Sequence, residues 1–330
     1  MIFSSQAHAT PSRWRRALTG AAILVLGTLG ACGGGTSQLE VFRPQRMFAF
    51  GDETSHLTAE GRKYGVNVLA ADSTTEINCS SQALWVQSVA SVFGFVFAEC
   101  NPDNLPETRA RMYAAPGATV TEVAAQIQAQ EQAGGFSEGD LATLLVGVND
   151  VVELYQQYPS LGEDALIAQA RARGAQIGGQ VNRLVALGAK VIVVNVPDIS
   201  FSPYARAQDV AFPGEDRSRL ILRLVTAMNE QLGVTMLLDG RFVGLVQADL
   251  TWQAIGRFPA GYGFSNLSDG VCTVPVPECT SATLQVANTE TGALVDPVNY
   301  LWADDSTRLS FGGQLQLARL AVDRVQRNPF

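Results

Sequence analysis

Histidine is nearly absent from this sequence. Only two occur in 330 residues, His8 and His56. Imidazole is the common general base near neutral pH and a common zinc ligand. A CxxC pair, the usual cysteine arrangement of a structural zinc site, is lacking as well. We therefore expect no metal and no cofactor, and any catalysis that needs imidazole depends on one of two residues.

The sequence also lacks an apolar run long enough to cross a bilayer comfortably. The nearest candidate, Ala17–Ala31, follows three arginines and has the length of the apolar core of a secretory signal. It runs into "LGAC" (Leu29–Cys32), which resembles the bacterial lipobox. The resemblance implies a lipoprotein signal peptide over residues 1–31 and a lipid on Cys32, with a plain signal peptide as the alternative. The following "GGGTSQ" predicts a flexible tether over residues 32–45.

Positive charge is in deficit. The chain has 23 Lys and Arg against 31 Asp and Glu, a formal charge of −8. Residues 1–31 hold three arginines and no acid, so without them the charge becomes −11. Such a chain is a poor partner for nucleic acid or, through charge, for anionic lipid. We expect the lipid on Cys32 to provide the membrane attachment in the cell envelope. Because no aspartate follows Cys32, the outer membrane is favoured, facing the periplasm or the surface.

Four cysteines follow Cys32, an even number that predicts two disulfides in an exported protein. Four cysteines allow three pairings. Proximity in sequence favours Cys79 with Cys100 and Cys272 with Cys279.

Short apolar runs alternate with longer stretches of helical spacing from Arg46 onward, with no internal linker. This pattern predicts one α/β domain over residues 46–330, a three-layer α/β/α sandwich with a parallel sheet. The expected strands are Met47–Gly51, Leu141–Gly147 and Lys190–Pro197, and a further apolar run is Phe242–Leu250. The expected helices are Ala83–Gly94, Thr119–Ala133, Glu163–Gly188, Asp216–Gly233 and Phe311–Gln326.

Ligands of such sheets bind at the carboxyl ends of the strands. Gly51–Glu53 and Gly147–Asp150 follow two of the expected strands, so we expect both segments at one rim. Asp150 and Asp198, also at strand ends, are expected to cap loops, and Trp85 and Trp302 to lie in the core.

Several blocks, in order, resemble those of the SGNH/GDSL hydrolase family of esterases and lipases, whose fold is flavodoxin-like. The resemblance covers most of the chain after the tether. The blocks are "FGDETS" (Phe50–Ser55), "YAAPGAT" (Tyr113–Thr119), "VGVND" (Val146–Asp150), "NVPDISFSP" (Asn195–Pro203), "YGFSNLSD" (Tyr262–Asp269) and "LWADDSTRLSFGG" (Leu301–Gly313).

The family's catalytic residues carry over only in part. Its nucleophilic serine falls on Glu53, and its catalytic histidine, three residues after the aspartate, falls on Thr307. Asp304 matches the acid of the triad, while Asn149 and Gly117 match the donors of the oxyanion hole. The Tyr113 block also departs from the family pattern, with Met112 where the family has Asn.

Without serine and histidine at these positions, the family's triad cannot form. His56 lies three residues after Glu53, and its use with Ser55 is disfavoured because sequence neighbours on a turn rarely face each other. The resemblance therefore implies a catalytically impaired protein, a binding or envelope-associated module whose ligand is an acyl ester, a lipid or a glycan. The alternative is an active ester hydrolase with a nonstandard residue set.

Glu53 itself has three interpretations. It is a surface glutamate without a role, or its carboxylate occupies the oxyanion hole and accepts hydrogen bonds from Asn149 and nearby amides. In the third, Glu53 and Asp304, with Asp52, form the carboxylate pair of a glycan hydrolase or a metal site. An aromatic content of 8% and the lack of an aspartate-rich loop disfavour the third.

Overall fold

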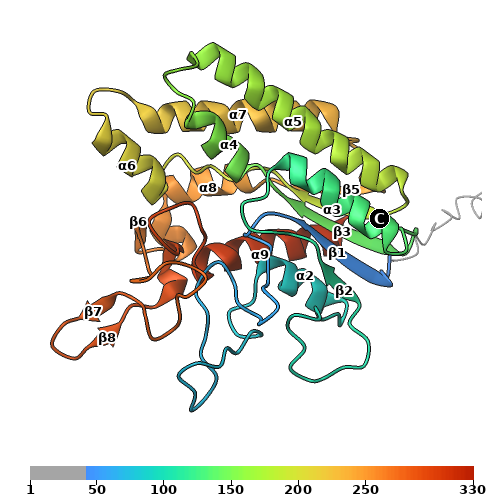
Figure 1. Cartoon of the computed structure of the whole chain (residues 1–330), viewed down its shortest axis with the longest axis horizontal. Helices are drawn as coiled ribbons and strands as arrows, with labels where there is room; N and C mark the ends of the chain where they lie inside the picture. The colour runs from blue at the N-terminus through green and yellow to red at the C-terminus, as the bar shows by residue number, and fades with distance from the viewer. Residues whose placement is uncertain (1–41) are drawn as a thin grey trace, which may run out of the picture. The chain divides into compact units, whose positions relative to one another are not determined.

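The computed structural model describes residues 42–330, and a five-stranded parallel sheet lies at its centre (Figure 1). The expected signal peptide, Cys32 and the tether as far as residue 41 lie outside the described residues. The strand order is β2-β1-β3-β4-β5. The strands are β1 Arg46–Gly51, β2 Ala110–Met112, β3 Asp140–Leu145, β4 Lys190–Val194 and β5 Val243–Val246.

Continuous apolar strands produce this sheet. In β1 and β3 nearly every residue is buried. Successive side chains of a strand point to opposite faces of the sheet, so both faces are covered. β1 lies between β2 and β3, with Met47 opposite Ala110 and Arg46 opposite Asp140. Gly51 ends β1 at φ +126°, where a Cβ would lie 1.8 Å from the Leu145 carbonyl oxygen. A side chain there would separate β1 from β3.

Helices cover the two faces of the sheet. One face carries α3 Val120–Gln132, α4 Val148–Tyr155, α5 Glu163–Ala186 and α7 Arg217–Thr235, and the other carries α2 Trp85–Val92 and α9 Phe311–Arg327 (Figure 1). The expected three-layer α/β/α fold is confirmed. Trp85 and Trp302 are fully buried, as expected.

Smaller elements complete the part of the chain that the structure describes. They are α6 Pro203–Ala211, α8 Ala248–Arg257, η2 Pro259–Tyr262, β6 Asn266–Gly270, β7 Val286–Asn288, β8 Ala293–Leu294, η3 Pro297–Asn299 and β9 Tyr300–Trp302. β6 pairs with β9, and β7 pairs with β8, both outside the main sheet.

Two boundaries differ from the sequence expectation. β3 ends at Leu145, and the VGVND block forms the first turn of α4 rather than the end of a strand. The apolar run Phe242–Leu250 divides into β5 and the start of α8, with Gln247 between them. Apolar residues suit buried helices as well as buried strands, so hydrophobicity alone does not mark these transitions.

Both disulfides join the cysteines that lie nearest in sequence. Cys79 pairs with Cys100 and Cys272 with Cys279, as expected. Both bridges lie in the loops outside the main sheet. Among residues 42–330, no helix combines the length and the apolar character needed to span a membrane.

Candidate functional site

Glu53 lies on a tight turn directly after β1, at the carboxyl edge of the sheet. The turn is closed by two backbone hydrogen bonds, from the Ser55 N–H to the Asp52 carbonyl (3.1 Å) and from the His56 N–H to the Glu53 carbonyl (3.2 Å). The Glu53 residue is only 4% exposed. A buried carboxylate needs hydrogen-bond donors or a cation, because removal from water disfavours its charge.

Three donors surround the Glu53 carboxylate. Its Oε2 accepts hydrogen bonds from the Gly117 N–H and from the Asn149 side-chain amide, each at 2.9 Å. Its Oε1 lies 3.1 Å from the Arg308 guanidinium. The carboxylate therefore lies against the two residues that match the family's oxyanion donors, and the surface interpretation of Glu53 does not fit.

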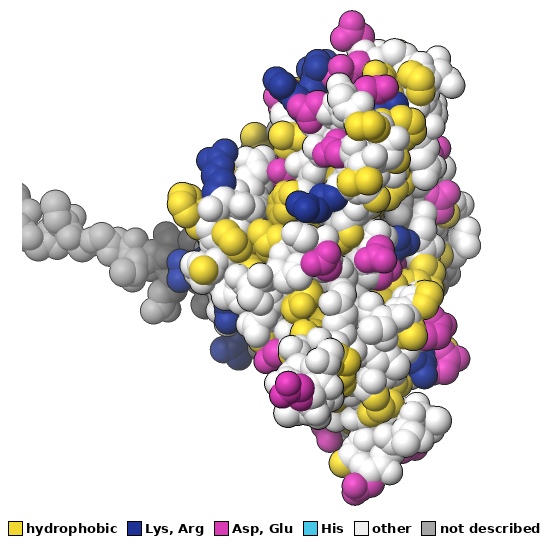
Figure 2. All heavy atoms as spheres, turned by 90° about the vertical axis from the view of Figure 1, so that its left-hand side faces the viewer, with side chains coloured by type: hydrophobic (Ala, Val, Ile, Leu, Met, Phe, Trp, Pro, Cys, Tyr) yellow, Lys and Arg dark blue, Asp and Glu magenta, His cyan; other side chains and the backbone are white. Residues whose placement is uncertain are grey.

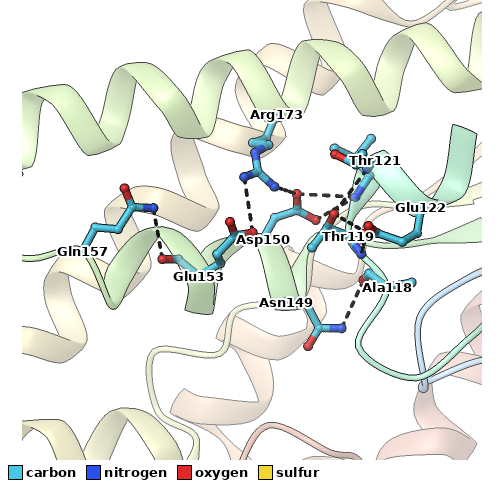
Figure 3. Close-up of polar contacts among 10 residues, drawn as sticks. Ala118, Thr119, Thr121, Glu122, Asn149, Asp150, Glu153, Gln157 and Arg173 are labelled. Carbon is cyan, nitrogen blue, oxygen red and sulfur yellow. Dashed lines mark hydrogen bonds and ion pairs between the residues drawn. The ribbon is translucent and has the colours of Figure 1, made fainter.

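The Asn149 amide is held in place on the α4 first turn. Its Nδ2 donates to the Ala118 carbonyl at 3.1 Å as well as to Glu53, so both of its hydrogens are used. Figure 3 shows the Asn149 side chain directed toward Ala118, while the neighbouring Asp150 is directed toward Arg173. The carbonyl of Ala118 thus orients the amide that donates to Glu53.

Gly117 contributes its backbone N–H from a left-handed conformation, with φ +73°. A Cβ added here would meet nothing within 4 Å, so the conformation rather than space favours glycine. The loop that holds Gly117 leads into α3, whose N-cap is Thr119.

Asp150 holds the helices around the site together. It accepts a hydrogen bond from the Val120 N–H at the start of α3 (3.1 Å) and pairs with Arg173 of α5 at 2.6 Å (Figure 3). Burial raises the pKa of the Asp150 carboxyl, and Arg173 opposes that shift. Asp150 is a capping residue, as expected, and Asp198 likewise accepts from the Ser200 N–H at 2.9 Å.

The terminal block reaches Glu53 through Arg308, which the sequence did not single out. Asp304 Oδ1 accepts from the Ser306 N–H (3.1 Å) and from the Ser306 hydroxyl. The Ser306 hydroxyl oxygen in turn accepts from Arg308 Nη1 at 3.1 Å. No local pattern in the sequence marks Arg308, because the burial of Glu53, which requires a cation nearby, is known only from the structure.

Thr307, at the position of the family's histidine, is 9% exposed. Its neighbour Arg308 makes the contact with Glu53. The side chain that reaches position 53 from this block is therefore a permanent cation, which cannot accept a proton as imidazole does.

Asp52 is fully buried beside Glu53. Its Oδ1 accepts from the Thr54 N–H at 2.9 Å, and its buried Oδ2 has no hydrogen-bond partner. Burial, and secondarily the Glu53 charge, raise the pKa of Asp52 well above its usual value. In residues 42–330 no three His, Cys, Asp or Glu side chains are grouped to hold a metal ion.

His56 and Ser55 have separate partners. His56 Nδ1 lies 2.6 Å from the Ala114 carbonyl oxygen, so that nitrogen carries the hydrogen. The Ser55 hydroxyl oxygen accepts from the buried Trp85 indole N–H at 3.1 Å. His56 lies in the loop that follows the Glu53 turn.

No family model and no curated protein match this chain. It is similar to solved structures of SGNH/GDSL hydrolases, the family that the sequence motifs resemble. One is a member of the lipolytic protein G-D-S-L family from Veillonella parvula, with 11% identity, 86% of this chain and 98% of that chain covered, and a TM-score of 0.43. Another is the acetylxylan esterase Axe2 from Geobacillus stearothermophilus, with 14% identity, 87% and 96% covered, and a TM-score of 0.41.

Proposed function

We propose that this chain is a lipid-anchored envelope protein whose SGNH-like domain does not hydrolyse esters and instead acts as a binding module. The observation that carries the proposal is the position of the Glu53 carboxylate, which accepts from Gly117 and Asn149 and pairs with Arg308. In this proposal Glu53 is a built-in occupant of the oxyanion site.

Two consequences of Glu53 oppose ester hydrolysis. A serine esterase needs its alcohol at the end of β1 and an open cluster of donors for the oxyanion of the reacting ester. Here the alcohol is replaced by an acid, and the acid fills the cluster. Loss of the serine or the histidine of such a triad costs about a millionfold in turnover. The chain has neither at the matching positions.

The envelope location is supported by the sequence alone. The arginine-led apolar segment and the LGAC motif support export and a lipid on Cys32. The absence of an aspartate after Cys32 supports the outer membrane. The ligand of the module is an acyl ester, a lipid or a glycan, the classes that the resemblance implies.

Occupancy of the site by Glu53 is tested by chemical rescue. The change Glu53→Ala removes the carboxylate and leaves the Gly117 N–H, the Asn149 amide and the Arg308 guanidinium without an anion. Acetate should then bind in its place and raise the melting temperature of the variant in a saturable manner. At tenfold its dissociation constant, acetate adds about 1.4 kcal/mol of stability.

The wild-type protein, titrated with acetate at the same ionic strength, is the control and should not be stabilised. The double change Glu53→Ala with Asn149→Ala should respond more weakly than Glu53→Ala alone. Equal stabilisation of wild type and Glu53→Ala by acetate would contradict a filled site.

The active-hydrolase alternative is tested on the wild-type protein. A fluorophosphonate probe that labels activated serines should leave it unlabelled, and short-chain aryl esters should not be turned over. Turnover that disappears in Glu53→Ala would refute the proposal.

A further inference from the structure

The edge opposite the Glu53 site has a different electrostatic character. All five strands are parallel, so their first residues lie along one edge, which we call the amino edge: residues 43–46, 107–111, 138–140, 188–190 and 237–243. Its cations are Arg43, Arg46, Arg109, Arg111, Lys190 and Arg241, and its acids are Glu107, Glu138, Asp140 and Asp239.

These side chains give the amino edge a formal charge of +2 in a chain whose charge without residues 1–31 is −11. The carboxyl edge has the opposite sign. Asp52, Glu53, Asp150, Asp198 and Asp249 come after the strands of the main sheet, and Asp304 comes after β9. Arg173 pairs with Asp150, and Arg308 pairs with Glu53. The charge of the described domain therefore differs between the two ends of its strands. The basic end is the one where β1 begins.

A pocket of about 490 Å³ opens on the amino edge at β1 and β2. It is lined by Gln45, Arg46, Glu107, Thr108, Arg109 and Arg111. Arg46 pairs with buried Asp140 at 2.7 Å, whereas Arg109 lies 4.0 Å from exposed Glu107, too far for a strong pair. Arg111 is exposed on β2. The pocket thus presents two exposed guanidiniums, the group best matched to phosphate oxygens.

Aliphatic side chains are exposed at the other end of the same edge and on the last turn of α7, which leads into it. Val234 is 78% exposed and Leu238 is 75% exposed, where α7 ends before β5. Arg241 is exposed beside them, and Lys190 Nζ lies 4.4 Å from the Phe242 ring centroid. Four strand spacings, about 19 Å, separate the β2 end from the β5 end. Figure 2 views the left-hand side of Figure 1, where Asp and Glu side chains, and some Lys and Arg side chains, are scattered among hydrophobic ones.

We propose that the amino edge rests on an anionic phospholipid surface, with the pocket at β1 and β2 taking a lipid phosphate. Exposed aliphatic residues combined with Lys and Arg are what interfacial binding to anionic bilayers uses. The inference rests on the proposed envelope location but not on the filled Glu53 site. Nine residues separate Cys32 from Phe42, and the ten steps of the chain between them reach at most about 36 Å, so a lipid on Cys32 would keep this edge near the membrane.

This orientation directs the Glu53 site away from the lipid, because the site lies at the carboxyl edge. The proposal departs from the expectation that the lipid on Cys32 alone provides the membrane attachment. The overall charge is acidic, but the local charge of the amino edge is not.

Vesicle flotation of the full chain tests the proposal. Cys32→Ser removes the lipid attachment point. Binding of this variant is compared on phosphatidylcholine vesicles and on vesicles with one quarter phosphatidylglycerol, and the contribution of the amino edge is read from the difference between its variants. We expect at least tenfold tighter binding to the anionic vesicles in 50 mM NaCl and loss of that difference in 500 mM NaCl. The added changes Arg109→Glu and Arg111→Glu should remove most of the difference.

The matched control is Arg206→Glu with Arg219→Glu, the same charge change near the carboxyl edge, which should keep most of the difference. Residues 1–31 are present in every variant, so their contribution to vesicle binding is the same in each. Equal binding to both vesicle types, or equal losses in the two double variants, would overturn the proposal. Melting temperatures verify that each variant is folded. Mass spectrometry of the wild-type protein tests the lipid on Cys32 separately, so the two proposals fail independently.

Discussion

At the scale of single residues, the buried carboxylate at position 53 depends on Arg308. Glu53 is 4% exposed, and its Oε1 has the guanidinium as its partner at 3.1 Å. The Gly117 and Asn149 hydrogen bonds go to the other oxygen. Removal of Arg308 therefore leaves a buried negative charge without its cation.

We expect Arg308→Met to lower the free energy of unfolding by about 1–3 kcal/mol in urea titrations. A fully buried pair costs 3–5 kcal/mol when one partner is removed, but Arg308 is a third exposed, so water screens part of the loss. The double change with Glu53→Gln should cost less than the sum of the single changes. Additive losses would show that the two side chains do not interact.

Asp52 makes a second residue-scale prediction. Its pKa is raised in the folded protein by burial and by Glu53, so the folded state binds the proton more tightly than the unfolded state. Stability therefore falls as the pH rises above 3.8, the ordinary Asp value, until Asp52 ionises in the folded state. Asp52→Asn cannot ionise, and should gain stability relative to wild type across that interval. Urea titrations between pH 4 and 8 measure the difference, and a constant difference would contradict the assignment.

At the scale of elements, the segment after Glu53 is a loop held by buried polar groups rather than by a helix or strand. Asn67 is fully buried, and its amide nitrogen shares its two hydrogens among the carbonyls of Lys63, Pro277 and Cys279, at 3.1, 2.8 and 3.2 Å. These bonds join the loop to the Cys272–Cys279 disulfide loop. Lys63 is 1% exposed, and its Nζ donates to the Ser81 carbonyl at 2.5 Å.

Burial lowers the pKa of Lys63 from 10.5 to about 8. The folded state therefore loses this proton at lower pH than the unfolded state, and stability rises as the pH increases from about 8 to about 10.5. The gain is about 3 kcal/mol over that range. Lys63→Met, which matches the apolar stem, should abolish the rise. Unfolding titrations at pH 7, 9 and 10.5 test this, and an unchanged slope in Lys63→Met would assign the rise to other groups.

The sequence predicts elements well where burial dictates composition. β1, β3, β4 and the long helices α5, α7 and α9 agree with the expected ranges within a few residues, because continuous apolar runs and helical spacing reflect the layers directly. The start of α4 and of α8 was missed because both begin within apolar runs. β2 was missed because three residues with one buried position carry little pattern.

The candidate site shows the same limit. The motifs, and the rule that strands of a parallel sheet end at one edge, predict that Glu53 lies near Gly117 and Asn149. Arg308 did not follow, because its contact joins segments 255 residues apart and leaves no local pattern.

At the scale of the whole molecule, two disulfides hold the loops that surround the sheet. Cys79–Cys100 encloses α2, and Cys272–Cys279 closes a short loop beside β6. We expect Cys79→Ser with Cys100→Ser to lower the free energy of unfolding by about 2–4 kcal/mol, because the open loop gains entropy in the unfolded state. Cys100 is buried in the main core and Cys79 packs against it, but most of that core is formed by other residues, so the sheet core should persist.

Hydrogen exchange distinguishes the expected local effect from a global one. Amides of residues 57–110 should exchange faster in the double variant, whereas amides of β3 and β4 should stay slow. The corresponding change of Cys272 and Cys279 should cost less, because its loop is shorter. Loss of protection throughout the sheet would contradict the local role.

The pairing of Glu53 with Arg308 also bears on how the protein can change through evolution. A serine restored at position 53 alone would leave the Arg308 guanidinium beside the donors and still no imidazole at position 307. A histidine at position 307 alone would meet a carboxylate rather than an alcohol. Neither single change provides both an alcohol and an imidazole, so under the proposed function serine-esterase chemistry requires both changes together, and the single-change intermediate gains no catalysis. Under the same proposal we expect descendants of this chain to diversify as binders.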